Sequence, residues 1–248
     1  MPVAQHFMEY GEFQELPAST RVKLTQGLVF QTADVAEDRP LRTSARQLKP
    51  YWMDQSESIG LMADTALDVQ DLGIEGVKLI KTRKFGDRRG FFSETYSQRD
   101  FSEAGINIDF VQDNQSMSSA VYTVRGLHFQ LPPFAQDKLV RVIRGSILDV
   151  AVDLRSRSST YGKYVSAVIS ADAWNQILVP IGFAHGFMTL EPDTEVIYKV
   201  SNNYSPEHDR GVLWSDRDLA IDWPNRAEAH LSDKDEKLPA FRDLPKVF

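Results

Sequence analysis

The chain has 248 residues, of which 42% are hydrophobic and 25% charged, ordinary proportions for a globular protein with one main core. Its formal net charge of −7 argues against a general nucleic-acid binder, which would normally carry a basic face. Because the sequence contains no cysteine, disulfides, thiolate catalysis and zinc–thiolate sites are excluded.

Residues 1–65 are weakly patterned and carry no recognisable chemical motif. Met1–Glu12 has no secretory-signal pattern, and no apolar run of the chain approaches the roughly 20 residues of a membrane helix. Strand-like alternation over Lys23–Phe30 and a helical pattern over Ser56–Leu67 are predicted in this part. We expect a cytoplasmic protein with an N-terminal extension that packs on the main domain or on a partner subunit, rather than a second catalytic domain.

Residues 66–248 are predicted to form the functional domain. An apolar run at Val77–Ile80 begins it, and Gly86–Gly90 is a turn signal. Ser97–Ala104 is predicted as a short helix, because its first residues have capping-box spacing and Gly105 follows its end.

The rest of this domain is predicted to consist mostly of strands. In the segment 148–154, Leu and Val alternate with Asp149, Ala151 and Asp153, and the segment 195–200 alternates in the same way. Many short strands separated by Gly and Pro turns indicate a β-sandwich or barrel. No Gly-rich strand-to-helix fingerprint is present, which argues against a dinucleotide-binding fold.

Two histidines lie in glycine-punctuated, strand-like segments. They are His128 in Arg125–Gln130 and His185 in Pro180–Phe187. Each taken alone is as readily a packed core residue as a functional one. The second segment resembles the Pro-x-Gly-x-x-His element of the cupin superfamily of small β-barrels.

The earlier motif of metal-binding cupins has a His-x-His pair and a glutamate, whereas this chain has His128-Phe129-Gln130. A catalytic metal site generally needs about three protein ligands of suitable type. We therefore expect a site with no metal and no cofactor. A retained metal, as in a metal-dependent cupin oxygenase or isomerase, is the alternative.

A barrel histidine without a metal can act as a general base near neutral pH. Lys138 follows His128 by ten residues, and its cation could stabilise an enolate oxygen. Tyr198 is on an alternating strand and could return a proton from the opposite face. In isolation, core packing is the better explanation of Tyr198, and a solvated strand edge is the better explanation of Lys138.

Short segments within residues 67–240 match one enzyme family in the same order along the chain. They are Gly86–Phe92, Phe110–Asn114, Arg125–Gln130, Gln136–Arg141, Asp149–Arg155, Pro180–Phe187, Tyr198-Lys199, Asn203–Pro206, Asp222–Pro224 and Leu231–Asp235. On these residues the chain resembles the dTDP-4-dehydrorhamnose 3,5-epimerase family of the cupin superfamily. The resemblance implies a mainly β fold, a cupin-type double-stranded β-helix (jelly-roll barrel) with a few short helices.

The resemblance also implies a reaction. The family converts dTDP-4-dehydro-6-deoxyglucose to dTDP-4-dehydrorhamnose by inverting C3 and C5, whose protons are acidified by the ketone at C4. It implies that His128 is the base, that Asp235 orients it and that Lys138 supports the enolate. Tyr198 would deliver a proton to the other face.

Binding residues carry over in the same way. Those matching positions around the nucleotide and the sugar are Arg89, Glu94, Gln112, Asn114, Arg125, His185 and Lys234. Tyr204 matches an aromatic residue that stacks on the thymine ring, and Asp209 stands where the family often has a glutamate near the nucleotide. The resemblance further implies a homodimer in which an N-terminal strand crosses to the neighbour, so that Arg89 and Glu94 would serve the partner's site.

Three alternatives to the 3,5-epimerase stay open. One is a mono-epimerase that inverts only C3 or C5 of a related nucleotide sugar, since Asp209 and Asn203 depart from the usual family residues. The others are the metal-dependent cupin and a non-catalytic sugar-nucleotide binder. In every case we expect no nucleic-acid partner and no membrane partner.

Overall fold

The computed structural model describes residues 67–248. The strand predicted over Lys23–Phe30 lies outside the described residues, as does the helix predicted over Ser56–Leu67 apart from its last residue. Leu67 instead begins the first strand.

Strands form most of the described part of the chain. They are β1 (Leu67–Asp71), β2 (Lys78–Thr82), β3 (Phe85–Asp87), β4 (Gly90–Phe92), β5 (Gln112–Ser118), β6 (Val124–Gln130), β7 (Lys138–Arg144), β8 (Ser146–Asp153), β9 (Tyr164–Ser170), β10 (Asn175–Val179), β11 (Phe183–Thr189), β12 (Thr194–Val200) and β13 (Asp209–Gly211). The helices are α3 (Gln98–Glu103) and the 3₁₀ turns η2 (Arg226–Glu228), η3 (Asp235–Lys237) and η4 (Phe241–Asp243).

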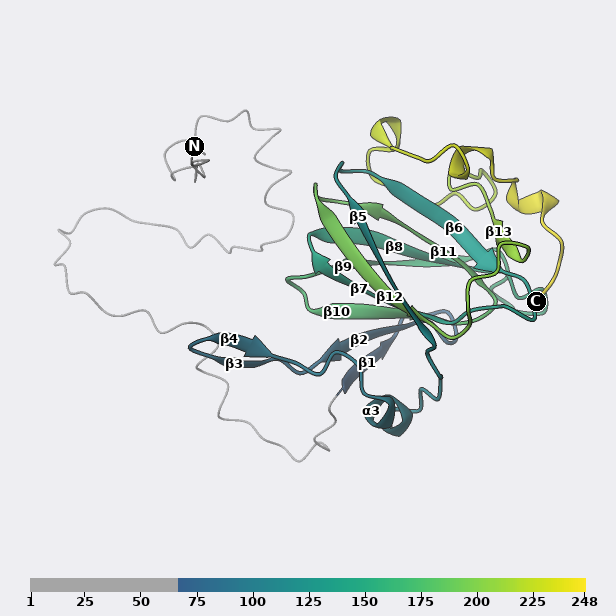
Figure 1. Ribbon diagram of the computed structural model, residues 1–248. Coiled ribbons are helices and arrows are strands. Elements are labelled where there is room, and N and C mark those ends of the chain that lie inside the picture. Colours follow the sequence, from purple (N-terminus) through teal and green to yellow (C-terminus); the bar gives the residue numbers. More distant parts are fainter. Residues whose placement is uncertain (1–66) are drawn as a thin grey trace, which may run out of the picture. The chain divides into compact units, whose positions relative to one another are not determined.

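The strands form two main antiparallel sheets that face each other (Figure 1). One has six strands in the order β1-β2-β10-β7-β12-β5, and the other has five in the order β13-β6-β11-β8-β9. Strands β3 and β4 form a separate hairpin. Sheet neighbours are mostly distant in sequence, as in a jelly roll, so the predicted cupin-type β fold is confirmed.

The alternation predicted for the segment 148–154 separates two cores. Ile147 and Ala151 of β8 pack in a cluster with residues of β7, β10 and β12, between the two sheets. Val150 and Val152 point the other way, into a cluster on the outer face of the five-stranded sheet. Period-two side-chain direction accounts for both clusters.

The C-terminal segment, residues 212–248, covers the outer face of the five-stranded sheet. Trp214 and Trp223 are buried there, and the Trp223 indole N–H donates to the carbonyl of Trp214 at 2.8 Å. In Figure 1 this segment, drawn in yellow-green to yellow, runs along β6 and β13. It brings η3 next to β6 and so completes the site described below.

Helix α3 occupies the predicted position. The Ser97 hydroxyl accepts a hydrogen bond from the backbone N–H of Asp100 at 3.4 Å, and Gly105 follows with a φ of +79°. Phe101 packs with Ile80 and Leu139. None of the helices in residues 67–248 is long and apolar enough to cross a membrane.

Candidate active site

A cavity of about 500 Å³ is lined by side chains from both sheets and from the C-terminal segment. Seven of the residues expected to be functional line it: Arg125, His128, Lys138, His185, Tyr198, Lys234 and Asp235. These residues come from β6, β7, β11, β12 and the segment around η3, so only the folded barrel brings all of them together.

A bulge in β6 turns two of these side chains into the same cavity. His128 pairs with His185 of β11, and Arg125 pairs with Phe187. Two residues of β6 separate these positions, whereas β11 has only one, so β6 carries one extra residue at Gly126. Strict alternation would have placed Arg125 and His128 on opposite faces.

Gly126 is required at the bulge for two reasons. Its φ is +114°, a conformation that side chains disfavour. A Cβ at this position would lie 2.7 Å from both the Gly186 Cα and the His185 carbonyl oxygen. The Arg-Gly-Leu-His sequence therefore encodes a close approach of two strands as well as two functional side chains.

His128 and Asp235 form the most direct polar contact in the cavity. The His128 Nε2 lies 2.6 Å from Asp235 Oδ1, with 31% of the histidine side chain exposed but only 6% of the aspartate. Burial raises the pKa of Asp235, but the hydrogen bond and charge of His128, with support from Gly126 and Ser232, bring that pKa below its ordinary value. A neutral imidazole that donates from Nε2 to this carboxylate keeps Nδ1 as its basic nitrogen.

Lys138, the first residue of β7, is one of the cationic residues that line the cavity. Its Nζ donates to the backbone carbonyl of His128 at 3.3 Å. Burial lowers the pKa of Lys138 to about 8, although the charges of Asp149 and Asp209 oppose this shift. The ammonium is thus charged at neutral pH and loses its charge in the mildly alkaline range.

Tyr198 lies on β12, opposite Asn114 of β5. Burial raises the pKa of Tyr198, Arg125 lowers it and Asp209 raises it, with a net increase. The phenol therefore stays protonated at neutral pH, as a proton donor must.

A second histidine–carboxylate pair lies beside the first. The His185 Nε2 is 2.8 Å from Asp149 Oδ2, and both residues are buried. The other oxygen, Oδ1, has no hydrogen-bond partner among the described residues. Asp149 was not predicted as functional, although a carboxylate on the inward face of an apolar strand is itself a signal.

The remaining expected nucleotide-side residues form a hydrogen-bonded chain. Gln112 Nε2 donates to Asn114 Oδ1 at 2.8 Å, and Gln112 Oε1 accepts from the Tyr204 backbone N–H at 3.3 Å. The Tyr204 hydroxyl donates to Asp209 Oδ2 at 3.0 Å. The Lys234 ammonium pairs with the same Asp209 oxygen at 2.5 Å. This series of hydrogen bonds reaches the cavity, because Lys234 is one of the residues that line the cavity.

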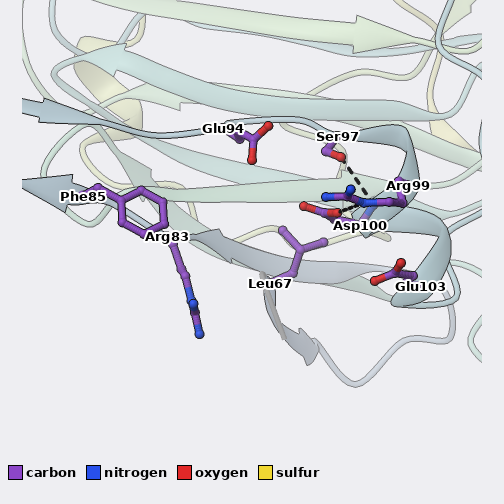
Figure 2. A pocket seen from close by; sticks show the side chains of 8 residues that line it. All are labelled: Leu67, Arg83, Phe85, Glu94, Ser97, Arg99, Asp100 and Glu103. Carbon is purple, nitrogen blue, oxygen red and sulfur yellow. Dashed lines mark hydrogen bonds and ion pairs between the residues drawn. The ribbon is translucent and has the colours of Figure 1, made fainter. Parts of the chain in front are cut away.

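Arg89 and Glu94 lie apart from this cavity in the single chain. Arg89 is at the turn of the β3–β4 hairpin with 84% of its side chain exposed, and its guanidinium makes a fork with Asp87 at 2.6–3.3 Å. Glu94 lines a different pocket of about 340 Å³, next to α3 (Figure 2). The Arg99–Asp100 ion pair lines the same pocket.

Within residues 67–248, no group of three or more His, Asp or Glu side chains is arranged to hold a metal ion. The groups that line the cavity include a histidine oriented by a carboxylate, a lysine and a protonated phenol. Such a set can remove a proton, stabilise an anion and return a proton. The fold is thus of the cupin type, and the cavity holds groups suited to acid–base chemistry.

Comparison with known proteins gives the family. Residues 71–243 match the family model described as dTDP-4-dehydrorhamnose 3,5-epimerase, and the chain belongs to this family of carbohydrate epimerases. It is 52% identical over 190 residues to the dTDP-4-dehydrorhamnose 3,5-epimerase of Sinorhizobium fredii, covering 75% of this chain and 97% of that relative.

Two solved structures are informative. The dTDP-4-dehydrorhamnose 3,5-epimerase of Bacillus anthracis, with TDP and PPi bound, is 50% identical with a TM-score of 0.69 and covers 71% of this chain and 99% of its own. A 3'-monoepimerase of Streptomyces bikiniensis in complex with dTDP-quinovose is 31% identical with a TM-score of 0.65, covering 69% and 86%. A protein similar to this chain is therefore named for inverting one carbon.

Proposed function

We propose that this protein inverts C3 and C5 of dTDP-4-dehydro-6-deoxyglucose to give dTDP-4-dehydrorhamnose. The observation that carries the proposal is the His128–Asp235 pair, which shares one cavity with Lys138 and Tyr198. Both carbons flank the C4 ketone, so removal of either proton gives an enolate.

Each inversion needs a base and an acid on opposite faces of the sugar ring. His128 takes the proton through Nδ1, and the buried Asp235 carboxylate stabilises the imidazolium that forms. The Lys138 ammonium stabilises the negative oxygen at C4. Tyr198 then donates its proton to the carbon from the other face, and exchange with solvent restores both residues for the second inversion.

In this proposal the nucleotide is bound by Arg125 and Lys234 of the cavity and by Tyr204 beside it. Arg125 and Lys234 suit the diphosphate, because their cations make charge-assisted hydrogen bonds to its oxygens. Tyr204, a residue that is 56% exposed, is available to stack its ring on thymine. Asp209 holds Tyr204 and Lys234 in place before the ligand arrives.

The proposal includes a homodimer. Arg89 is exposed and lies outside its own chain's cavity, so we assign it and Glu94 to the partner's site. Residues 66–248 would form the epimerase domain, and residues 1–65 an N-terminal extension. The cytoplasmic location expected from the sequence stays a prediction.

The test is the configuration of the product. The full chain is incubated with dTDP-4-dehydro-6-deoxyglucose, and proton coupling constants in the NMR spectrum identify the configuration at C3 and C5. Inversion at both carbons supports the proposal, whereas inversion at one indicates a mono-epimerase. Binding of dTDP without turnover indicates a non-catalytic binder, and loss of turnover on treatment with a chelator indicates a metal-dependent enzyme.

A further inference from the structure

The β3–β4 hairpin carries Arg89 at its turn and needs outside support. All six of its strand residues are exposed, and an isolated two-stranded hairpin of this length is marginally stable at best. Figure 1 shows it extending beside the main sheets rather than within one of them. Its base is closed by the Ser93 hydroxyl, which donates to the carbonyl of Arg83 at 2.5 Å.

One face of the hairpin is held by three side chains that we call the aromatic clamp: Lys84, Phe91 and Trp174. The Phe91 and Trp174 rings meet edge to face, with centroids 4.9 Å apart and planes at 80°. The Lys84 ammonium lies 4.2 Å from the Phe91 centroid and 4.1 Å from that of Trp174. A single cation thus interacts with both rings and joins the hairpin to the turn between β9 and β10.

Trp174 combines an unusual backbone conformation with contacts to its indole from both the hairpin and the sheet. Its φ is +53°, the left-handed region that a bulky residue occupies only at a cost. Such strain persists where the surroundings over-determine the residue. Besides Phe91 and Lys84, the guanidinium of Arg141 lies 5.3 Å from the Trp174 ring centroid, so the indole is fixed from the sheet as well as from the hairpin.

The hairpin is held at its base by the aromatic clamp, and Arg89 is oriented at its turn. Asp87 holds the Arg89 guanidinium, with Nη2 to Oδ2 at 2.6 Å, although 84% of the arginine side chain is exposed. A clamped hairpin base and an oriented arginine at the turn reduce the freedom that the guanidinium would lose on binding an anion.

We propose that the aromatic clamp positions Arg89 to bind the diphosphate of a nucleotide sugar held in a second copy of the chain. The inference rests on the proposed function and its homodimer. Trp174, Lys84 and Phe91 act through the hairpin and do not touch the substrate, so they are positioning residues. Loss of the clamp weakens substrate binding but leaves the proton transfers intact.

The experiment compares Trp174→Ala, Trp174→Phe and Arg89→Ala, alone and as the Arg89→Ala/Trp174→Ala double variant, in the full chain. Steady-state kinetics with the keto sugar nucleotide give KM and kcat. Arg89→Ala is expected to raise KM about tenfold or more, because a charge-assisted hydrogen bond is lost. Trp174→Ala is expected to raise KM in the same direction with kcat unchanged, and Trp174→Phe to restore it. In the double variant, Trp174→Ala adds nothing to the effect of Arg89→Ala.

Two further variants separate positioning from folding. Lys84→Gln removes the exposed cation without opening a cavity and is expected to raise KM by a smaller factor. Asp172→Ala, an exposed change in the same turn, is the matched control and is expected to leave KM unchanged. Circular dichroism and sedimentation check that each variant is folded and dimeric.

The outcomes are distinguishable. If Arg89→Ala raises KM while Trp174→Ala and Lys84→Gln do not, or if the effects of Arg89→Ala and Trp174→Ala multiply, the clamp does not position Arg89. If Arg89→Ala leaves KM unchanged, then Arg89 does not bind the substrate and the clamp has no such role. Product inversion by the wild-type chain would still stand in either case.

Discussion

Replacing Asp235 by asparagine removes the charge that orients His128 while keeping nearly the same shape. The His128 Nε2 to Asp235 Oδ1 distance is 2.6 Å, and 94% of the aspartate side chain is shielded from water. A hydrogen bond to a charged group of this kind contributes about 1.5–3 kcal/mol. Because a tenfold change in rate corresponds to about 1.4 kcal/mol, Asp235→Asn should lower kcat about 10- to 150-fold.

The assay is steady-state epimerisation of the keto sugar nucleotide. KM should change little, because Asp235 acts on the base rather than on the substrate. Asp233→Asn, an exposed carboxylate two residues earlier, is the matched control and should behave as wild type. A kcat within about twofold of wild type in Asp235→Asn, or a change confined to KM, would refute the assignment of Asp235 as the partner of the base.

Three further predictions concern other charged or polar groups. Since burial lowers the pKa of Lys138 to about 8, kcat/KM should fall as the pH rises through that value. Lys138→Arg, which stays charged, should abolish this fall, and the same fall of kcat/KM at alkaline pH in the variant would contradict the role of Lys138. Tyr198→Phe should still exchange substrate protons with solvent through the base but should invert at least about 100-fold more slowly, and full inversion would exclude Tyr198 as the acid. Burial raises the pKa of Asp153, but hydrogen bonds led by Arg155 bring it down to about 2. Because the folded-state pKa of Asp153 lies below the ordinary value, the charged carboxylate stabilises the fold fully above about pH 4, and this stabilisation disappears as the pH falls toward about 2. Asp153→Asn should therefore lower the unfolding free energy, measured by urea titration, by about 2 kcal/mol at pH 7 and by less at pH 3.

Local patterns predicted the elements that depend on local physics. The alternation in β8 correctly separated inward from outward side chains, because one face of each strand packs between the sheets. The Ser97 cap and Gly105 delimited α3, and Gly86–Gly90 marked the hairpin turn. In each case the deciding interactions lie within a few residues of each other.

Contacts between residues far apart in the sequence could not be predicted from local patterns. Asp235 reaches His128 only because the C-terminal segment wraps the five-stranded sheet, and the family resemblance, rather than any spacing, indicated the pair. The bulge at Gly126 breaks the period of two that the sequence pattern assumes. The contact between Phe91 and Trp174 joins a hairpin to a turn far along the chain, and neither segment alone predicts it.

Proton removal by His128 is the central claim, and deuterium incorporation tests it most directly. The wild-type chain and His128→Asn are incubated with the keto sugar nucleotide in D2O, and NMR follows the loss of the C3 and C5 proton signals. The wild type should incorporate deuterium at both carbons, and His128→Asn at neither above the rate without enzyme. Exchange by His128→Asn at a rate close to that of the wild type would contradict the account.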